Sequence, residues 1–238
     1  MRPRRGRTPV PNKTLFFLGT AALAALVLPG CRPPRAFLGP VPSEIREIEG
    51  EASLKVTRNG ETSRSRFAFV LEMSRRGRVV VTDLLGSAAA EFVFAGDDGY
   101  LVLPTKKIYW KAGPTEIVEK LLGFPLTFDE MAGLICGRGP AGAGNGGPFR
   151  EWSFERDGDG RTRAGRKSGL EFTVDSFFPG SSVPRTVDFH DALGSGRLTV
   201  RGIEFNGPGA EAAFRLDFLG VFASKSWEEI AGILRHED

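Results

Sequence analysis

The chain has few of the residues on which most catalytic and metal sites depend. Its 238 residues include only two cysteines and two histidines. No HExxH, paired-cysteine, GxSxG or P-loop pattern occurs in it. His236 stands near the end of the sequence, and His190 followed by Asp191 at the end of an expected strand is typical of a turn. We therefore expect no enzymatic activity, no resident metal and no cofactor.

Two glycine-rich segments resemble ligand loops only in composition. Residues 142–147 read Gly-Ala-Gly-Asn-Gly-Gly, but they precede an expected strand, whereas a phosphate-binding loop opens a helix. Residues 157–160 read Asp-Gly-Asp-Gly without the downstream glutamate of a calcium loop. The first segment predicts a loop and the second a hairpin turn.

The beginning of the sequence has the pattern of an export signal. Five basic residues precede an apolar run from Thr14 to Leu28, which continues into Pro29-Gly30-Cys31. A basic start, a short apolar core and a small residue before the cut are typical of secretory signals. The run has 15 residues, and a transmembrane helix needs about 20. The alternative is a cytosolic protein with a buried amphipathic start.

The cysteine at the end of this pattern resembles the lipobox of bacterial lipoproteins. The resemblance implies a diacylglyceryl group on Cys31, cleavage after Gly30 and acylation of the new amine. Residues 1–30 would then be the signal peptide and 31–43 a lipidated, proline-rich tether. Arg32, where an aspartate would retain the protein in the inner membrane, favours an outer-membrane lipoprotein that faces the periplasm.

Export changes what the charge and the cysteines mean. The full chain has a formal net charge of +3, but five of its 32 basic residues and none of its 29 acidic residues lie in residues 1–30. The mature chain therefore carries 27 basic and 29 acidic residues, a net charge of −2, and we expect no nucleic-acid partner. Cys136 would be the single remaining thiol. Its apolar neighbours predict a small buried residue, and a reactive thiol is the alternative.

From Gly50 onward the sequence alternates with the period of β-strands. Apolar and polar residues alternate from Ala52 to Thr57, and Asn59-Gly60 is a hairpin signal. Further strands are expected at residues 66–71, 78–82, 91–94, 100–103, 149–154, 170–174, 186–190, 197–205 and 213–218, and a short one that ends at Trp110. About ten strands and one helical pair predict a mainly β (α+β) protein, a curved antiparallel sheet with helices on one side.

The helical pair lies in the middle of the chain. Apolar residues at helical spacing predict one helix that starts at Pro114 and a second, capped by Thr127, that ends at Gly137. One or two helical turns are also expected over residues 43–49. A short amphipathic helix capped by Ser226 is expected in the C-terminal tail. Residues 44–222 are the expected domain and 223–238 a C-terminal helical extension.

The residues expected to face inward are rich in aromatic side chains. An ordinary filled core is one explanation, and an apolar cavity inside the curved sheet is the other. The candidates for lining such a cavity are Phe67, Phe69, Leu71, Phe92, Phe94, Leu101, Leu103, Ile117, Leu121, Trp152, Phe154 and Phe172. Composition does not choose between the two explanations.

The order of elements and several local motifs resemble the LolA/LolB superfamily of lipoprotein carriers, and LolB most closely. The family has a strand that ends in Leu-Thr-Asn-Pro-Leu-Gly-Ser, and residues 81–87 read Val-Thr-Asp-Leu-Leu-Gly-Ser. Its Gly-X-Pro step between two helices matches residues 123–125, and the glycine that ends the second helix matches Gly137. Val183-Pro184 matches a late Val-Pro, and the similarity covers residues 44–205.

The resemblance implies an incomplete barrel with a short helical lid over a hydrophobic cavity that holds acyl chains. It also implies a function: accepting acylated lipoproteins from a LolA-like periplasmic carrier and inserting them into the inner leaflet of the outer membrane. We expect a monomer. A leucine on a protruding loop of LolB is needed for insertion and matches Leu85, so Leu84, Leu85 and Gly86 form the expected insertion loop. The alternative is that both leucines pack under the loop.

The chain departs from the family in three places. The leading helix is short or missing, the loop at 137–148 is long and glycine-rich, and the tail beyond residue 206 adds a strand and a helix. These departures leave two other functions open. One is a lipid-anchored periplasmic carrier of a free lipid or glycolipid, and the other is a non-catalytic envelope scaffold with a filled core.

Overall fold

The computed structural model describes residues 36–73, 75–83, 86–138, 150–207 and 210–235. The predictions for Cys31, Leu84 and Leu85 therefore lie outside the described residues. Residues 34–238 form one compact unit of the chain. A protein that starts after Cys31 consequently keeps every element described below.

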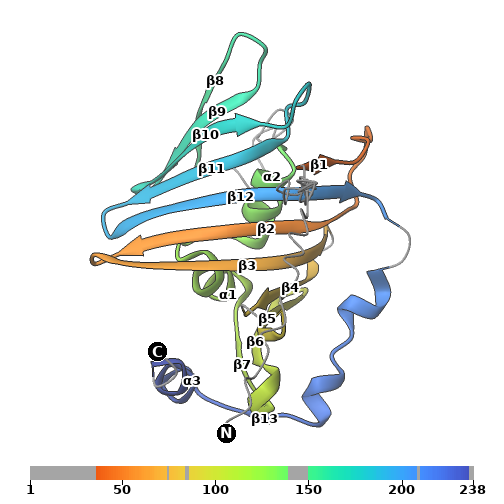
Figure 1. Ribbon diagram of the computed structural model, residues 1–238, viewed down its shortest axis with the longest axis vertical. Coiled ribbons are helices and arrows are strands. Elements are labelled where there is room, and N and C mark those ends of the chain that lie inside the picture. Colours follow the sequence, from red (N-terminus) through yellow and green to blue (C-terminus); the bar gives the residue numbers. More distant parts are fainter. Residues whose placement is uncertain (1–35, 74, 84–85, 139–149, 208–209, 236–238) are drawn as a thin grey trace, which may run out of the picture. The chain divides into compact units, whose positions relative to one another are not determined.

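Thirteen strands of the described residues form a single sheet, drawn in Figure 1. They are β1 (Phe37–Leu38), β2 (Glu47–Arg58), β3 (Glu61–Glu72), β4 (Arg76–Thr82), β5 (Ala88–Ala95), β6 (Asp98–Leu103), β7 (Ile108–Ala112), β8 (Ser153–Arg156), β9 (Thr162–Lys167), β10 (Leu170–Phe177), β11 (Pro184–Asp191), β12 (Gly194–Phe205) and β13 (Ala223–Ser224). A short 3-10 helix, η1 (Pro104–Lys106), joins β6 to β7.

The strand order makes this sheet open at both ends. It runs β13-β7-β6-β5-β4-β3-β2-β12-β11-β10-β9-β8, with β1 beside β12. The strands from β2 to β7 form one antiparallel meander, and those from β8 to β12 form a second. Antiparallel pairing of β2 with β12 joins the two meanders into one curved sheet (Figure 1). The predicted class, a mainly β incomplete barrel with few helices, is confirmed.

Two short helices lie on one face of this sheet, which we call the inner face. Helix α1 (Pro114–Leu122) begins with proline at its first turn and ends at Gly123, whose φ of 78° is the left-handed conformation that glycine adopts readily. Helix α2 (Phe128–Ile135) begins with a capping box, in which Thr127 and Glu130 bond each other's backbone N–H groups. Both helices are confirmed where the sequence predicts them.

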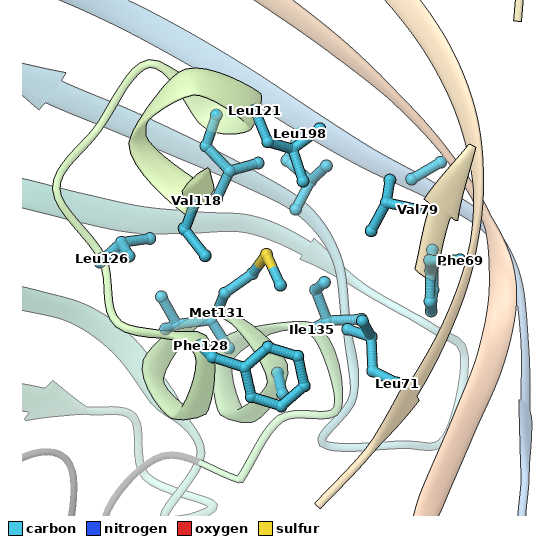
Figure 2. Packing of buried hydrophobic residues seen from close by; sticks show 14 of the residues in the cluster. Phe69, Leu71, Val79, Val118, Leu121, Leu126, Phe128, Met131, Ile135 and Leu198 are labelled. Atoms are coloured by element: carbon cyan, nitrogen blue, oxygen red, sulfur yellow. The ribbon is translucent and has the colours of Figure 1, made fainter. Parts of the chain in front are cut away.

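The core fills the space between these helices and the inner face. In Figure 2, Val118 and Leu121 of α1 and Met131 and Ile135 of α2 point towards side chains of β3, β4 and β12. These residues belong to one buried apolar cluster that extends across the inner face. Strand alternation directs the side chains of this cluster to the inner face and the intervening side chains to the opposite face, which we call the outer face.

The tail after β12 wraps over the outer face, where it differs from the prediction. Residues 213–218 are not a strand but parts of two 3-10 helices, η2 (Ala210–Phe214) and η3 (Asp217–Gly220). Phe218 packs edge-on against Tyr100 and Tyr109, with both ring centroids 5.5 Å away. Apolar residues at every second position therefore cover β6 and β7 instead of pairing as a strand.

The chain then returns to the inner face at the β7 edge. Strand β13 pairs with β7, and α3 (Trp227–Arg235) follows, with Ser226 and Glu229 bonded reciprocally as the predicted cap. Trp227 packs on Trp110 at 5.0 Å between ring centroids, and Ile230 is fully buried in the core cluster. The C-terminal helix is thus part of the packed domain.

Other predictions also miss. The strand expected over residues 149–154 begins only at Ser153, because β8 spans Ser153–Arg156. Residues 43–49 contain no helix, because the side chain of Asn206 accepts from the N–H groups of Arg46 and Glu47 and donates to the carbonyl of Glu44, which holds the segment extended. Strand β9 was not predicted, since glycine interrupts its short, basic sequence. Glycine is required at position 165 because a Cβ there would clash with the Phe172 ring of the neighbouring strand β10.

The close approach of α1 to β6 gives a stability prediction. A Cβ at Gly99 would lie 2.6 Å from Cγ1 of Ile117, so Gly99→Ala should push α1 off the sheet and lower the free energy of unfolding by about 1–3 kcal/mol. Denaturant unfolding measures the change. Gly232→Ala, in α3 with open space around it, should leave stability unchanged or raise it by up to about 1 kcal/mol. Equal stability of Gly99→Ala and the parent would contradict the packing.

Candidate functional site

The inner face brings all twelve predicted cavity candidates into one cluster. Eleven of them are buried, and Phe154 is half-buried and packed against the rest. Eleven of them come from β3, β5, β6, α1, β8 and β10, and Trp152 lies immediately before β8. The sequence therefore identifies which residues face inward, while their role in holding a ligand stays a prediction.

Side chains of the two helices and of the connection between them occupy the middle of this cluster. Phe124 stacks on Phe189 of β11 at 5.4 Å, and Phe128 packs on Phe94 of β5 at 5.0 Å between ring centroids. Phe124, Leu126 and Met131 are all 2% exposed or less. An acyl chain that entered beneath the sheet would have to take the place of these side chains. We call the segment from α1 to α2, residues 114–135, the helical plug.

A buried carboxylate attaches the plug to the second meander. Glu130 in α2 has a side chain that is 2% exposed, and Lys167 of β9 places its Nζ 2.7 and 2.9 Å from the two carboxylate oxygens. The indole N–H of Trp152 donates to the same carboxylate at 2.7 Å, and the backbone N–H of Thr127 donates at 2.8 Å. Every charge of this group is therefore neutralised and hydrogen-bonded.

This polar group is the main feature of the site that the sequence analysis misses. Thr127-x-x-Glu130 is a capping-box spacing, so a signal for Glu130 exists, but nothing in the sequence links it to Lys167, 37 residues later. The Glu130 carboxylate accepts four hydrogen bonds, two from Lys167 and one each from Trp152 and Thr127. Its evident effect is to hold α2 against β9 and Trp152.

Aromatic side chains surround the same attachment. Trp152 stacks on Phe154 at 5.9 Å and tilts against Phe172 at 5.3 Å. The Nζ of Lys167 lies 5.7 Å from the centre of the Trp152 ring. Three of the predicted cavity candidates thus form one aromatic group around the Glu130–Lys167 pair.

The predicted insertion loop has a closed base. Asp83 and Ser87 bond each other at the ends of the loop: the N–H of Asp83 donates to the Ser87 carbonyl at 3.0 Å, and the N–H of Ser87 donates to the Asp83 carboxylate at 2.9 Å. Gly86 has a φ of 83°, which suits glycine in a tight turn. Leu84 and Leu85, which the prediction places at the membrane, lie outside the described residues.

The remaining candidates from the sequence have structural roles. Cys136 is buried, 3% exposed, and burial raises the pKa of its thiol, as expected for a small apolar residue and not for a reactive one. Asp157 accepts from two backbone N–H groups of its turn and from the guanidinium groups of Arg161 and Arg163, which confirms the hairpin turn. Within the described ranges, no group of three or more metal-ligating side chains occurs.

None of the described helices is long and apolar enough to cross a membrane.

Of the comparisons with known proteins, only the one with solved structures finds similar proteins. No protein-family model matches the sequence, and no curated protein is similar to it. Solved structures with a similar arrangement include a LolA superfamily protein from Nitrosomonas europaea, at 8% identity and a TM-score of 0.45, with 75% of this chain and 93% of that one covered. Another is the domain of a protein described as an outer membrane lipoprotein-sorting protein, from Vibrio parahaemolyticus, at 9% identity and a TM-score of 0.47, with 74% of this chain and 92% of that one covered.

A third similar structure is a DUF1329 family protein from Desulfovibrio piger, at 8% identity and a TM-score of 0.49, with 74% of this chain and 92% of that chain covered. Because every one of these scores is below 0.5 and the identities are 8–9%, they do not assign the chain to a family. The neighbours are of the LolA, DUF1329 and lipoprotein-sorting kinds, and a specific relation to LolB stays a prediction.

The buried pair gives the second stability prediction. Lys167→Met removes the cation and leaves the Glu130 carboxylate buried without its charge partner, which should cost about 3–5 kcal/mol of unfolding free energy. The double variant Glu130→Gln/Lys167→Met should recover part of that loss, because no unpaired charge remains. Arg166→Met, which breaks the exposed pair with Glu171, is the matched control and should cost at most about 1 kcal/mol. Equal losses at Lys167 and Arg166 would contradict the buried attachment.

Proposed function

We propose that this protein is a lipid-anchored carrier that holds acyl chains beneath its open sheet. More specifically, we propose that it accepts acylated lipoproteins from a LolA-like periplasmic carrier and inserts them into the inner leaflet of the outer membrane, without a catalytic group. The observation that carries the proposal is the continuous apolar cluster on the inner face, covered by two short helices and left open at both sheet ends.

The energetics of exchange favour a reversible carrier. A long acyl chain gains on the order of 10 kcal/mol when it leaves water, at about 0.8 kcal/mol per methylene. Displacement of Phe124, Leu126, Phe128 and Met131 would cost about 6–12 kcal/mol, at about 1.5–3 kcal/mol for each large side chain. Because the two quantities are similar, a cargo chain and the plug can replace each other with a small net change. Loading and release then need no ATP.

The experiment that tests the proposal is a transfer assay. A soluble form that starts after Cys31 is mixed with a LolA-type carrier loaded with an acylated lipoprotein, and movement of the cargo is followed. Transfer is the expected result. Binding of a fluorescent fatty acid without transfer would favour the carrier of a free lipid or glycolipid instead. A folded protein that binds neither would contradict acyl carriage and favour a scaffold with a filled core.

The plug mechanism predicts that one destabilising variant binds ligand more tightly. Met131→Ala removes a plug side chain, so it should lower stability and also lower the cost of admitting a fatty acid. A reduction of about 1–2 kcal/mol would tighten binding roughly 5- to 30-fold. Val102→Ala is the control, because Val102 is buried in the separate cluster between the sheet and the C-terminal tail. If both variants, or neither, changed the affinity, the plug mechanism would be wrong.

The insertion loop is tested by one charge substitution. Leu85→Glu should leave fatty-acid binding intact and block delivery of cargo to vesicles, because a carboxylate does not enter the leaflet as a leucine does. Leu193→Glu is the matched control: Leu193 is 64% exposed in the turn between β11 and β12, away from that loop in the sequence. Normal delivery by Leu85→Glu would show that the protruding leucine is not needed.

A further inference from the structure

A cluster of cations lies on the outer face, opposite the core. A hollow of about 670 Å³ over β2, β3 and β12 is lined by five basic side chains and a single acidic one, Asp83. The basic side chains are Lys55, Arg64, Arg66, Arg197 and Arg201. We call this site the basic hollow.

The strand register sets these cations against one another. Lys55 of β2 is directly opposite Arg64 of β3 on one side and Arg197 of β12 on the other. Like charges at directly opposite positions of neighbouring strands are destabilising. Arg201 stands at the irregularity between Val200 and Gly202, where the β2–β12 register shifts, and it lines the same hollow. Three adjacent strands thus direct positive charge to one place.

Little of this charge is neutralised within the protein. Arg197 pairs with Asp188, with Nε 2.6 Å from Oδ1. In the described part of the chain, the other four cations form no ion pair with an acidic side chain. Lys55, Arg64 and Arg66 are exposed. Since the mature chain has a net charge of −2, the positive charge here is a local feature and not an overall excess.

The position of the hollow indicates which anion it meets. Asp83 and Gly86, which flank the predicted insertion leucines, both line it. The chain enters the domain through β1, where Phe37 is in register with Gly202, the residue after Arg201. Six Cα steps separate Phe37 from Cys31, a span of at most about 22 Å. A membrane-held Cys31 would therefore keep the hollow close to lipid head groups.

We propose that the basic hollow binds the phosphate groups of an anionic bilayer, so that the outer face of β2, β3 and β12 lies on the membrane surface. The inference rests on the proposed membrane location, but it concerns orientation and not cargo. Lysine and arginine side chains near an anionic leaflet each contribute roughly fivefold to binding. Glu49, Glu51 and Glu204 line a neighbouring hollow on the same face, which confines the contact to its basic part.

Vesicle binding tests this inference. The soluble form that starts after Cys31 should bind vesicles of equal parts phosphatidylglycerol and phosphatidylcholine, and bind phosphatidylcholine vesicles weakly or not at all. Added salt should weaken the binding, because the contacts are exposed to solvent. Arg64→Gln/Arg66→Gln should reduce the affinity for the anionic vesicles roughly 25-fold. Circular dichroism checks that each variant is folded.

The matched control removes the same charge elsewhere. Arg150→Gln/Arg185→Gln neutralises two exposed arginines outside the hollow, so it should change vesicle affinity much less. Equal losses in the two double variants, or a folded Arg64→Gln/Arg66→Gln that binds like the parent, would overturn the proposal. Fatty-acid binding, measured on the same proteins, should be unchanged by both. Failure of the vesicle test with intact fatty-acid binding would therefore leave the proposed carrier function standing.

Discussion

The ladder between β2 and β12 is the constraint on which the rest of the structure depends. It pairs eleven positions of two long strands that lie some 140 residues apart in the sequence, from Gly194 opposite Arg58 to Phe205 opposite Ile48. Without it, the chain would form two separate antiparallel meanders, each with an apolar face exposed to water. With it, the connection between the meanders, which contains α1 and α2, lies across the inner face of one continuous sheet. The placement of the plug is therefore a consequence of how the sheet is joined.

That placement gives the inner face two possible occupants. The plug side chains bury themselves against the aromatic and aliphatic residues of the sheet, and an acyl chain would gain a similar free energy from the same surface. A scaffold would need only the first occupant, whereas a carrier needs both. The Glu130–Lys167 pair is informative here, because it ties α2 to the second meander with a specific polar contact in an otherwise apolar interior. A buried polar contact whose groups are all hydrogen-bonded specifies a single position of a helix, whereas apolar packing tolerates several.

The outer face has two parts, one covered by apolar side chains and one lined by charged side chains. The tail from η2 to η3 covers β5 to β7 with apolar side chains. The basic hollow and the neighbouring hollow lined by Glu49, Glu51 and Glu204 lie over β2, β3, β4 and β12. The protein therefore has a covered side, a charged side and an apolar inner face on one sheet. A lipid-anchored protein that exchanges acyl chains at a bilayer would use the charged side for orientation and the inner face for cargo.

The sequence by itself determined the elements whose signals are local. The Asn59-Gly60 hairpin, the capping of α2 by Thr127, the left-handed Gly123 after α1 and the inward side of each predicted strand all follow from neighbours a few residues apart. Alternation in the strands and helical spacing in α1 together identified the twelve inward candidates. Alternation failed at residues 213–218, because apolar residues at every second position cover a sheet in 3-10 helices as well as they pair in a strand.

Only the tertiary structure decided which distant residues meet. The partners Glu130 and Lys167, the row formed by Arg64, Lys55 and Arg197, and the seat of α3 on Trp110 depend on strand register and on the order of strands in the sheet. These contacts join residues far apart along the chain, and their stability comes from packing and desolvation that exist only once the sheet has formed. No local pattern carries that information.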